Sequence, residues 1–164
     1  MVHRTSLLQK SVITFLSALV TLTGCYSPQP EAICCAGAPT TELQEHCSAA
    51  VDQWYYHSGR GQDSCENGEN SYWALETTVE HLYVEEGGRR IGAAATTDYR
   101  NLTITIEQKH LISPRLYSLV LHEIGHALGA PHNDDPESCM HTGIPLDQLQ
   151  PNITPLDALA VQRN

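Results

Sequence analysis

One stretch of the sequence, residues 122–132, restricts the fold more than any other, and its letters are HEIGHALGAPH. Two of its histidines, His122 and His126, stand four residues apart, so on a helix both rings project from one face and can bind a single Zn²⁺. Glu123 follows the first histidine and is placed to act as general base for a water on that metal. The stretch therefore predicts a helix that carries a metal site.

A third histidine, His132, completes the expected ligand set only if the chain turns. It lies six residues after His126, which is out of reach on a continuing helix. Gly129 can take the left-handed conformation that ends a helix, and Pro131 cannot continue one. Three protein ligands would leave the fourth zinc position open, as in catalytic sites. The alternative is an ordinary amphipathic helix whose histidines are solvated or cap its end.

The whole pattern, H-E-x-x-H-x-x-G-x-x-H, resembles that of the metzincin zinc endopeptidases. Met140 lies eight residues after His132, a spacing similar to the methionine turn of the matrixin branch, and residues 153–162 are similar to the matrixin closing helix. The resemblance is specific over residues 113–163, and it implies that Met140 forms an apolar floor beneath the histidines without binding metal. The chain departs from the family at Asn133, where matrixins usually have serine. No tyrosine follows two residues after Met140, so the extra ligand of astacins and serralysins is missing.

Residues 1–24 are expected to be a signal peptide rather than part of the fold. A short polar start with Arg4 and Lys10 leads into a mostly apolar run, which is too short to span a membrane but suits a signal-peptide core. The run ends in LTGC, which resembles the bacterial lipobox, so Cys25 would become the lipid-bearing N-terminus. We therefore expect a lipid-anchored protein of the bacterial cell envelope, at the outer membrane, its periplasmic face or the cell surface. The alternative is a plain secretory signal with an incidental cysteine.

The mature chain that this cleavage would produce is strongly acidic. Loss of Arg4 and Lys10 leaves seven basic residues against nineteen acidic ones, a formal charge of −12. Nucleic acid is therefore not an expected partner, because its phosphates are bound by basic patches. One domain of this size can bury an adequate core, and we expect a monomer.

The cysteines other than Cys25 are expected to form disulfides, because an exported protein folds in an oxidising compartment. They are Cys34, Cys35, Cys47, Cys65 and Cys139. Five cysteines leave one unpaired, and their spacing does not give the connectivity. Cys34 and Cys35 lie in residues 25–40, whose prolines and weak periodicity predict an exposed, lipidated tether. The alternative role for this pair is to block the zinc, as a cysteine does in matrixin zymogens, although the motif of that pro-segment is absent.

Residues 41–164 are predicted to form a single metalloprotease domain. A helix is predicted over residues 41–57, with Thr40 or Thr41 as N-cap and Gly59 after its end. Strand patterns follow over residues 74–79, 81–84, 91–97 and 102–106. The remaining histidines, His46, His57, His81 and His110, are expected to be surface or packing residues rather than ligands.

Two further helices are predicted toward the C-terminus. Ser113 and Pro114 are expected to cap the zinc helix, whose buried face would comprise Leu116, Leu119, Val120 and Ile124. A last helix would begin with Thr154 as N-cap and Pro155 as its first residue, with the acidic Asp157 in its first turn.

The resemblance implies a small α+β metzincin fold, in which a twisted, mainly parallel mixed sheet is backed by two helices and followed by a methionine turn and a C-terminal helix. We place residues 91–97 at the sheet edge that borders the cleft, where a peptide substrate could add as a strand. The small side chains of residues 92–95 would let its backbone approach closely.

The function that these features imply is zinc-dependent endopeptidase activity on a peptide or protein substrate. Zinc would lower the pKa of its bound water, and Glu123 would take the proton as the water attacks a peptide carbonyl. Glu123 would then give the proton to the leaving amine. Two alternatives stay open. A non-catalytic zinc-binding scaffold or adhesin would have no need of Glu123, and a zinc amidase acting on cell-wall peptide would differ only in its substrate.

Overall fold

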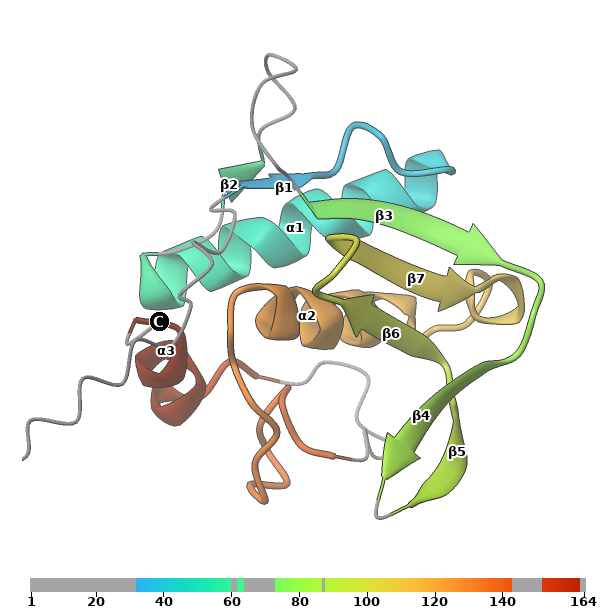
Figure 1. The fold of residues 1–164 in the computed structure, drawn as a ribbon. Coiled ribbons are helices and arrows are strands. Elements are labelled where there is room, and N and C mark those ends of the chain that lie inside the picture. Colours follow the sequence, from blue (N-terminus) through green and yellow to red (C-terminus); the bar gives the residue numbers. More distant parts are fainter. Residues whose placement is uncertain (1–31, 60–61, 64–72, 87, 143–151, 163–164) are drawn as a thin grey trace, which may run out of the picture.

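The part of the chain that the structure describes folds into an α+β domain built on a five-stranded sheet and three helices. The computed structural model describes residues 32–59, 62–63, 73–86, 88–142 and 152–162. The sheet has the strand order β2-β1-β3-β7-β6, and β4 and β5 form a separate hairpin (Figure 1). The strands are β1 (Ala32–Cys34), β2 (Gln62–Asp63), β3 (Trp73–Thr78), β4 (Leu82–Glu86), β5 (Arg89–Ala93), β6 (Ala95–Asp98) and β7 (Thr103–Glu107). The helices are α1 (Thr41–Ser58), α2 (Leu116–Ala127) and α3 (Pro155–Gln162), with a short 3₁₀ helix over Gln108–His110.

The sheet is mixed and mainly parallel, as predicted. Strands β2, β1, β3 and β7 pair in parallel, and β6 is antiparallel to β7, with Ala95 opposite Ile106 and Asp98 opposite Thr103. Alternate residues of β7 face the core, and Ile104 and Ile106 are fully buried. Strand β6 ends the sheet, so its outer side is an edge.

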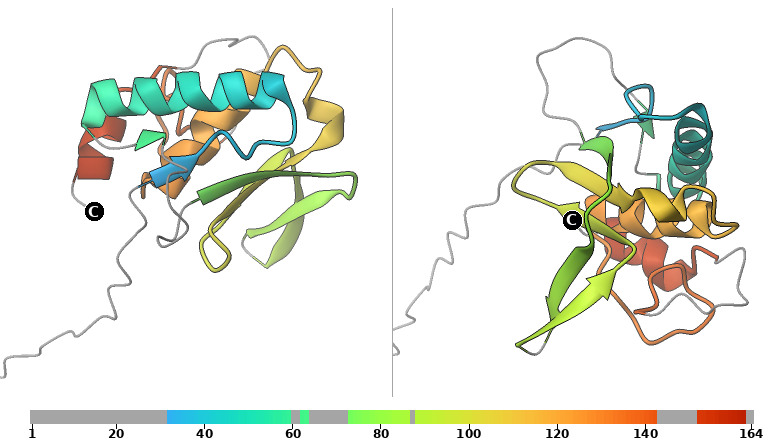
Figure 2. Two further views of the ribbon diagram at one scale, coloured as in Figure 1. Left: turned by 90° about the horizontal axis from the view of Figure 1, so that it is seen from above. Right: turned by 90° about the vertical axis from the view of Figure 1, so that its right-hand side faces the viewer.

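Helices α1 and α2 lie together on one face of this sheet, as Figures 1 and 2 show from three directions. Helix α1 begins where predicted, because the Thr40 hydroxyl accepts a hydrogen bond from the amide of Leu43 at 3.2 Å. It ends at Gly59, whose φ of 70° is left-handed. Trp54 of α1 donates its indole N–H to the carbonyl oxygen of Leu121 in α2 at 2.9 Å. This bond joins α2 to α1.

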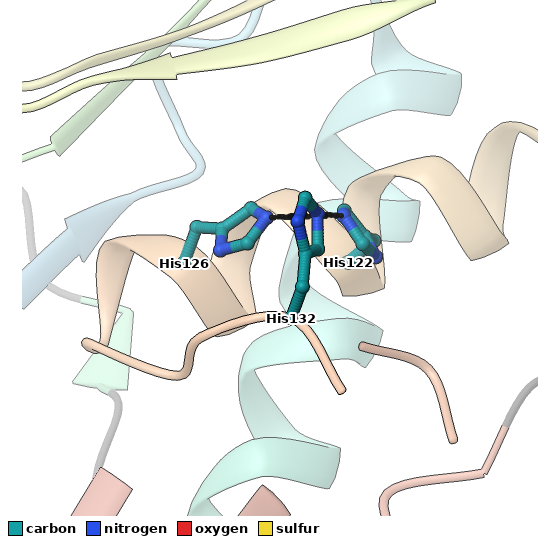
Figure 3. Close-up of side chains that lie close together, drawn as sticks. All are labelled: His122, His126 and His132. Carbon is teal, nitrogen blue, oxygen red and sulfur yellow. Dashed lines mark hydrogen bonds between the residues drawn. The ribbon is translucent and has the colours of Figure 1, made fainter. Parts of the chain in front are cut away.

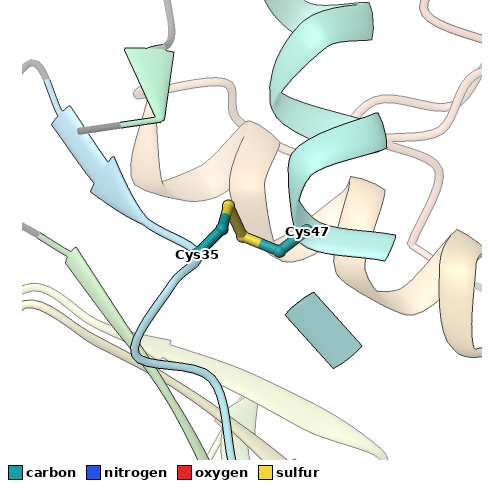
Figure 4. The surroundings of a disulfide bond; sticks show 2 residues. All are labelled: Cys35 and Cys47. Carbon is teal, nitrogen blue, oxygen red and sulfur yellow. A yellow bond between two sulfur atoms is a disulfide. The ribbon is translucent and has the colours of Figure 1, made fainter. Parts of the chain in front are cut away.

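The core fills the space between the sheet and the two helices. Its largest fully buried side chains include Trp54, Trp73, Leu75, Ile104, Leu121 and Ile124. A disulfide between Cys35 and Cys47 joins the end of β1 to α1 (Figure 4), and Cys34 is also disulfide-bonded. Cys139 is a free, buried cysteine. The predicted disulfide formation is therefore confirmed for Cys34, Cys35 and Cys47.

The N-terminal signal peptide and Cys25 lie outside the described residues, so those expectations stay predictions. No helix in the described part of the chain is long and apolar enough to cross a membrane.

The expected tether differs from the structure over residues 32–34. These residues form β1 inside the sheet, and Ile33 is fully buried there. The reason is that this short apolar run finds a parallel partner on each side, β2 and β3. The prediction of an exposed linker is therefore wrong for this segment.

The single strand predicted over residues 91–97 is two strands that belong to different sheets. The chain leaves one sheet at Ala93 and joins the other at Ala95. Strand β5 pairs with β4, whereas β6 pairs with β7. The predicted position at the sheet edge is correct for β6 alone.

The zinc helix begins later than predicted. Its first residue is Leu116, and Ser113 instead closes a turn before it, because its carbonyl accepts a hydrogen bond from the Leu116 amide at 2.9 Å. Leu116, Val120 and Ile124 are buried as predicted. Leu119 is only half-buried and lines the cleft, because it shares a helix face with His122.

Candidate metal centre

Three histidine nitrogens converge at one point in front of α2. The Nε2 atoms of His122 and His126 are 3.1 Å apart, and they lie 3.1 Å and 3.0 Å from Nε2 of His132. Figure 3 shows the three rings meeting, two from the helix and one from the segment that follows it. Within the described residues, these three are the group whose ligand atoms could hold a metal ion. The predicted triad is therefore brought together by the fold.

The hydrogen bonds behind the rings decide which nitrogen faces the centre. Nδ1 of His122 donates to the carbonyl oxygen of Cys139 at 2.6 Å, and Nδ1 of His126 donates to that of Ala130 at 2.9 Å. A carbonyl oxygen only accepts, so in the neutral rings the proton is on Nδ1 and Nε2 presents a lone pair. A hydrogen bond from the second ring nitrogen to a carbonyl oxygen is typical of metal-binding histidines.

The converging lone pairs fit a cation. The Nε2 lone pairs of His122 and His126, 3.1 Å apart, repel each other unless a positive charge lies between them. Tetrahedral zinc with bonds of 2.0–2.1 Å separates its ligand nitrogens by about 3.3–3.4 Å. Rearrangement by a few tenths of an ångström would therefore accommodate Zn²⁺ in this donor set.

Burial favours the neutral rings that a metal needs. Burial is the main cause that lowers the pKa of His122 to about 4, and repulsion from protonated His126 and His132 contributes to this value. Burial is also the main cause that lowers the pKa of His126. These two rings are therefore neutral at physiological pH, the form that binds metal.

The chain reverses at Gly129, which explains how His132 reaches the centre. Gly129 has a φ of 95°, and its amide donates to the carbonyl of His126 at 2.7 Å. The amide of Ala130 donates to the carbonyl of Gly125 at 2.8 Å. These two bonds form a Schellman motif, the helix end that a left-handed glycine allows. The predicted turn is confirmed.

Glu123 lines the same cleft as the two helical histidines and is only 6% exposed. The Thr97 hydroxyl of β6 donates to its Oε2 at 2.6 Å. Burial raises the pKa of Glu123 to about 7, although the hydrogen bond from Thr97 opposes this rise. A group with a pKa near neutrality is suited to accepting and returning a proton. A cation at the triad would lower this pKa by attraction to the carboxylate.

Met140 is fully buried and packs against the zinc helix at Gly125. A Cβ atom built on Gly125 would lie 2.4 Å from Met140 Sδ and 2.5 Å from Cζ2 of Trp54. Only a glycine lets the methionine and the tryptophan approach the helix backbone this closely. This placement is compatible with the predicted apolar floor.

A buried carboxylate, Asp157 of α3, anchors the methionine turn. Its two oxygens each lie 2.8 Å from the hydroxyl of Ser138, and Oδ1 accepts a bond from Asn133 at 2.6 Å. The Ser138 hydroxyl in turn accepts from the amide of Met140 at 2.8 Å. The side chain of Asn133, the residue that departs from the matrixin pattern, therefore holds the turn from the other side. Thr154 caps α3 as predicted, with its hydroxyl 3.4 Å from the amide of Asp157.

The triad and Glu123 open into a cleft of about 600 Å³. Residues 91–97 and Tyr99 form one wall. Arg115, which directly precedes α2, and the α2 residues Leu119, His122, Glu123 and His126 also line the cleft. His141 and Thr142, which follow the methionine turn, also line it. The fourth coordination position of a metal held by the triad would therefore face an accessible cleft.

The other candidate ligands lie apart from this centre. His46 contacts the Tyr117 ring at 5.9 Å between centroids, and His57 contacts Tyr56. His81 and His110 lie near the carboxylate of Glu107. The described residues form no second metal group around them.

Residues 91–97 were expected beside the cleft, but the sequence did not indicate that Thr97 contacts Glu123 or that Tyr99 belongs to the site. Tyr99 donates its hydroxyl to the carbonyl of His126 at 2.6 Å, and Thr97 contacts Glu123. Thr97 lies on β6 and Tyr99 directly follows this strand, so both are far in sequence from residues 122–132. Gly125 did carry a signal, because a glycine inside a predicted helix usually has a packing reason.

Comparison with known proteins gives one match. The family model described as Matrixin matches residues 48–164. The matched range contains the triad, Glu123 and Met140. No curated protein and no solved structure matches the chain significantly.

Proposed function

The chain belongs to the matrixin family, and we propose that it is a zinc-dependent endopeptidase with Glu123 as its general base. The observation that carries this proposal is that Glu123 and the three histidines line one cleft. A zinc site that served only stability would have no use for a buried carboxylate at this place.

His122, His126 and His132 would hold the metal through Nε2, with the first two rings oriented by the carbonyls of Cys139 and Ala130. Bound zinc would supply a Lewis acid that polarises the substrate carbonyl and makes a water nucleophilic at neutral pH. Glu123 takes a proton from the attacking water and returns it to the leaving amine.

Thr97 keeps the general base in place during these transfers. Its hydroxyl holds Oε2 of Glu123 and also approaches the main-chain oxygen of the same residue at 3.2 Å. The carboxylate is therefore fixed relative to the sheet edge.

The substrate backbone would bind along β6. This strand is the last of the sheet, and its residues 95–97 line the cleft. An extended peptide that adds to this edge would gain main-chain hydrogen bonds. The small residues Gly92, Ala93 and Ala94 leave room beside it, and a Cβ on Gly92 would meet no atom within 4 Å.

A Glu123→Gln variant tests the proposal. It keeps the three histidines and nearly the same side-chain shape, so it should retain zinc, but the rate should fall by about 10²–10⁴ through loss of the proton acceptor. Metal content and cleavage of a broad peptide library are measured for the wild type, for this variant and for Glu45→Gln, which changes an exposed glutamate on α1.

Two results would overturn the proposal in different ways. If Glu123→Gln cleaves as fast as the wild type, Glu123 is not the general base. If the zinc-loaded wild type cleaves nothing in the library, the result favours the alternative of a non-catalytic zinc-binding scaffold over a general endopeptidase.

We also propose that the protein is anchored in the bacterial cell envelope by lipid on Cys25. The lipobox-like sequence LTGC supports this anchor, and lipid chains on one cysteine are enough for stable membrane attachment. In a Cys25→Ser variant, cell fractionation should move the protein from the membrane pellet to the soluble fraction. Retention in the pellet would place the anchor elsewhere.

A further inference from the structure

One arginine in the cleft is unusual because no carboxylate of the described residues pairs with its charge, although part of its side chain is buried. Arg115 lies at the N-terminal end of α2, is half-buried and lines the same cleft as the triad. Its Nη2 atom is buried and has no hydrogen-bond partner. A buried donor of a charged group costs free energy when it is left unpaired. Such a group is suited to bind an acceptor that enters the cleft.

Other basic groups nearby differ from Arg115 in this respect. Lys109, which like Arg115 contributes to the lowered pKa of His110, pairs with the carboxylate of Glu107. No carboxylate of the described residues lies within ion-pair distance of the Arg115 guanidinium, although the chain has nineteen acidic residues against nine basic ones. The charge also acts on its surroundings, since repulsion from Arg115 contributes to the lowered pKa of His110.

We propose that Arg115 binds a carboxylate of the substrate and makes the cleft selective for peptides that carry one near the cleaved bond. This inference rests on the proposed peptidase function and adds a substrate class to it. A guanidinium recognises a carboxylate through two parallel charge-assisted hydrogen bonds from two of its nitrogens, and the unpaired Nη2 can donate one of them.

The helix gives the approximate position of this subsite. Arg115 precedes His122 by seven residues, which is about 10 Å along a helix axis. An extended peptide advances about 3.3 Å per residue. The carboxylate should therefore belong to a residue within about three positions of the cleaved bond.

Two sources could supply the carboxylate, an acidic side chain or the C-terminal carboxylate of a short peptide. Two series of peptides, which differ only in the kind of carboxylate they carry, distinguish these two sources. In one series, Glu replaces Gln at each of three positions on either side of the bond, with the C-terminus amidated. In the second series, the same peptides end in a free acid at increasing distance from the bond.

Two measurements are made on these peptides, so that the test does not depend on catalysis. Cleavage by the zinc-loaded wild type gives kcat/KM, and fluorescence anisotropy gives Kd for the Glu123→Gln protein. Each is repeated with Arg115→Gln, with Arg115→Lys, and with Arg100→Gln as the control, which removes the same charge at an exposed position outside the cleft lining. Thermal unfolding checks that the variants are folded.

We expect carboxylate peptides to be preferred by about ten- to a hundredfold over their neutral partners, the usual effect of a hydrogen-bonded charge pair. Arg115→Gln should abolish this preference, Arg115→Lys should keep part of it, and Arg100→Gln should leave it unchanged. The series in which the preference occurs shows whether the carboxylate comes from an acidic side chain or from the C-terminus.

The inference is overturned if neither series shows a preference, or if Arg115→Gln keeps the preference in full. Failure of the proposed function gives a different result. In that case no peptide is cleaved, and the Kd values alone decide whether Arg115 binds carboxylate.

Discussion

The hydroxyl oxygen of Thr97 lies 2.6 Å from Oε2 of Glu123 and 3.2 Å from the main-chain oxygen of the same residue. A threonine hydroxyl has one proton to donate, so the two acceptors share it and hold the side chain between them. Thr97 belongs to β6 and Glu123 to α2, so this contact links the strand expected to bind substrate to the residue expected to move protons. A substrate at the strand edge would thus be positioned relative to the general base.

Replacing Thr97 by Val should slow catalysis without loss of metal. The variant removes the hydroxyl and leaves Glu123 free to rotate, and a hydrogen bond to a charged group corresponds to a loss of about ten- to a hundredfold in kcat/KM. Zinc content should stay at the wild-type level, because no ligand changes. Thr97→Ser keeps the hydroxyl and should retain most activity. Equal activity of Thr97→Val and the wild type would show that the contact plays no part in catalysis.

Removing one ligand should abolish tight zinc binding. His126→Ala leaves two nitrogens of the triad. Changing a residue that only supports a metal ligand lowers metal affinity by up to about a hundredfold, so loss of a ligand itself should lower the zinc affinity by more than that. Zinc should raise the thermal unfolding temperature of the wild type but not of the variant. His57→Ala, at an exposed position of α1, is the control. Full zinc stoichiometry in His126→Ala would exclude the triad as the binding site.

Acid should weaken the same zinc site in the wild type. Protons compete with the metal for imidazole nitrogens, so the apparent affinity decreases as the pH falls.

The parts of the site that the sequence predicts are those fixed by local geometry. Residues four apart share a helix face, and Gly129 is free to adopt the left-handed conformation, so the positions of His122, His126 and His132 follow from spacing alone. The helix over residues 41–57 follows from its cap and its apolar periodicity in the same way. Each of these features depends on residues that are close in the sequence.

Contacts between distant segments could not be predicted in this way. Thr97 and Glu123 are 26 residues apart, and nothing in the sequence gives the register of β6 against α2. The break between β5 and β6 at Ala94 interrupts a run of small and β-branched residues that reads as one strand. Which sheet each half joins is decided by pairing with β4 and β7.

The stability of the fold in acid should depend on Glu107. This residue is 3% exposed, and its Oε1 accepts a hydrogen bond from the amide of Leu82 at 2.8 Å. The ion pair with Lys109 is the main cause that lowers the pKa of Glu107 to about 2, and the Leu82 amide adds to it. The folded pKa is thus below the unfolded value of about 4.5. The stabilisation is present above about pH 4.5 and is lost as the pH falls toward 2.

A Glu107→Gln variant isolates this effect. Unfolding midpoints of the wild type and the variant are measured from pH 7 to pH 2. The advantage of the wild type should be constant above about pH 5 and should shrink below pH 4.5. Glu76→Gln, which changes an exposed carboxylate on β3, controls for net charge. An advantage that stays constant down to pH 2 would contradict the assignment.

Gly125 is the position where the smallest change should do most harm to the site. An alanine has the higher helix propensity by about 1 kcal/mol, so on that basis alone Gly125→Ala would stabilise α2. The added methyl group, however, would overlap Met140 and Trp54, which are both fully buried. Overpacking of a core costs about 1–3 kcal/mol and can cost more when neither neighbour can move away.

The cost of overpacking should therefore exceed the gain in helix propensity, and Gly125→Ala should be less stable than the wild type by about 1–3 kcal/mol in denaturant unfolding. Its zinc affinity should fall as well, because displacing Met140 would shift the neighbouring Cys139, whose carbonyl orients His122 at 2.6 Å. Gly92→Ala is the matched control, since a Cβ there meets no atom within 4 Å. If Gly125→Ala is as stable as Gly92→Ala, the methionine turn yields to the added methyl group, and close packing at Gly125 is not what holds Met140 beneath the histidines.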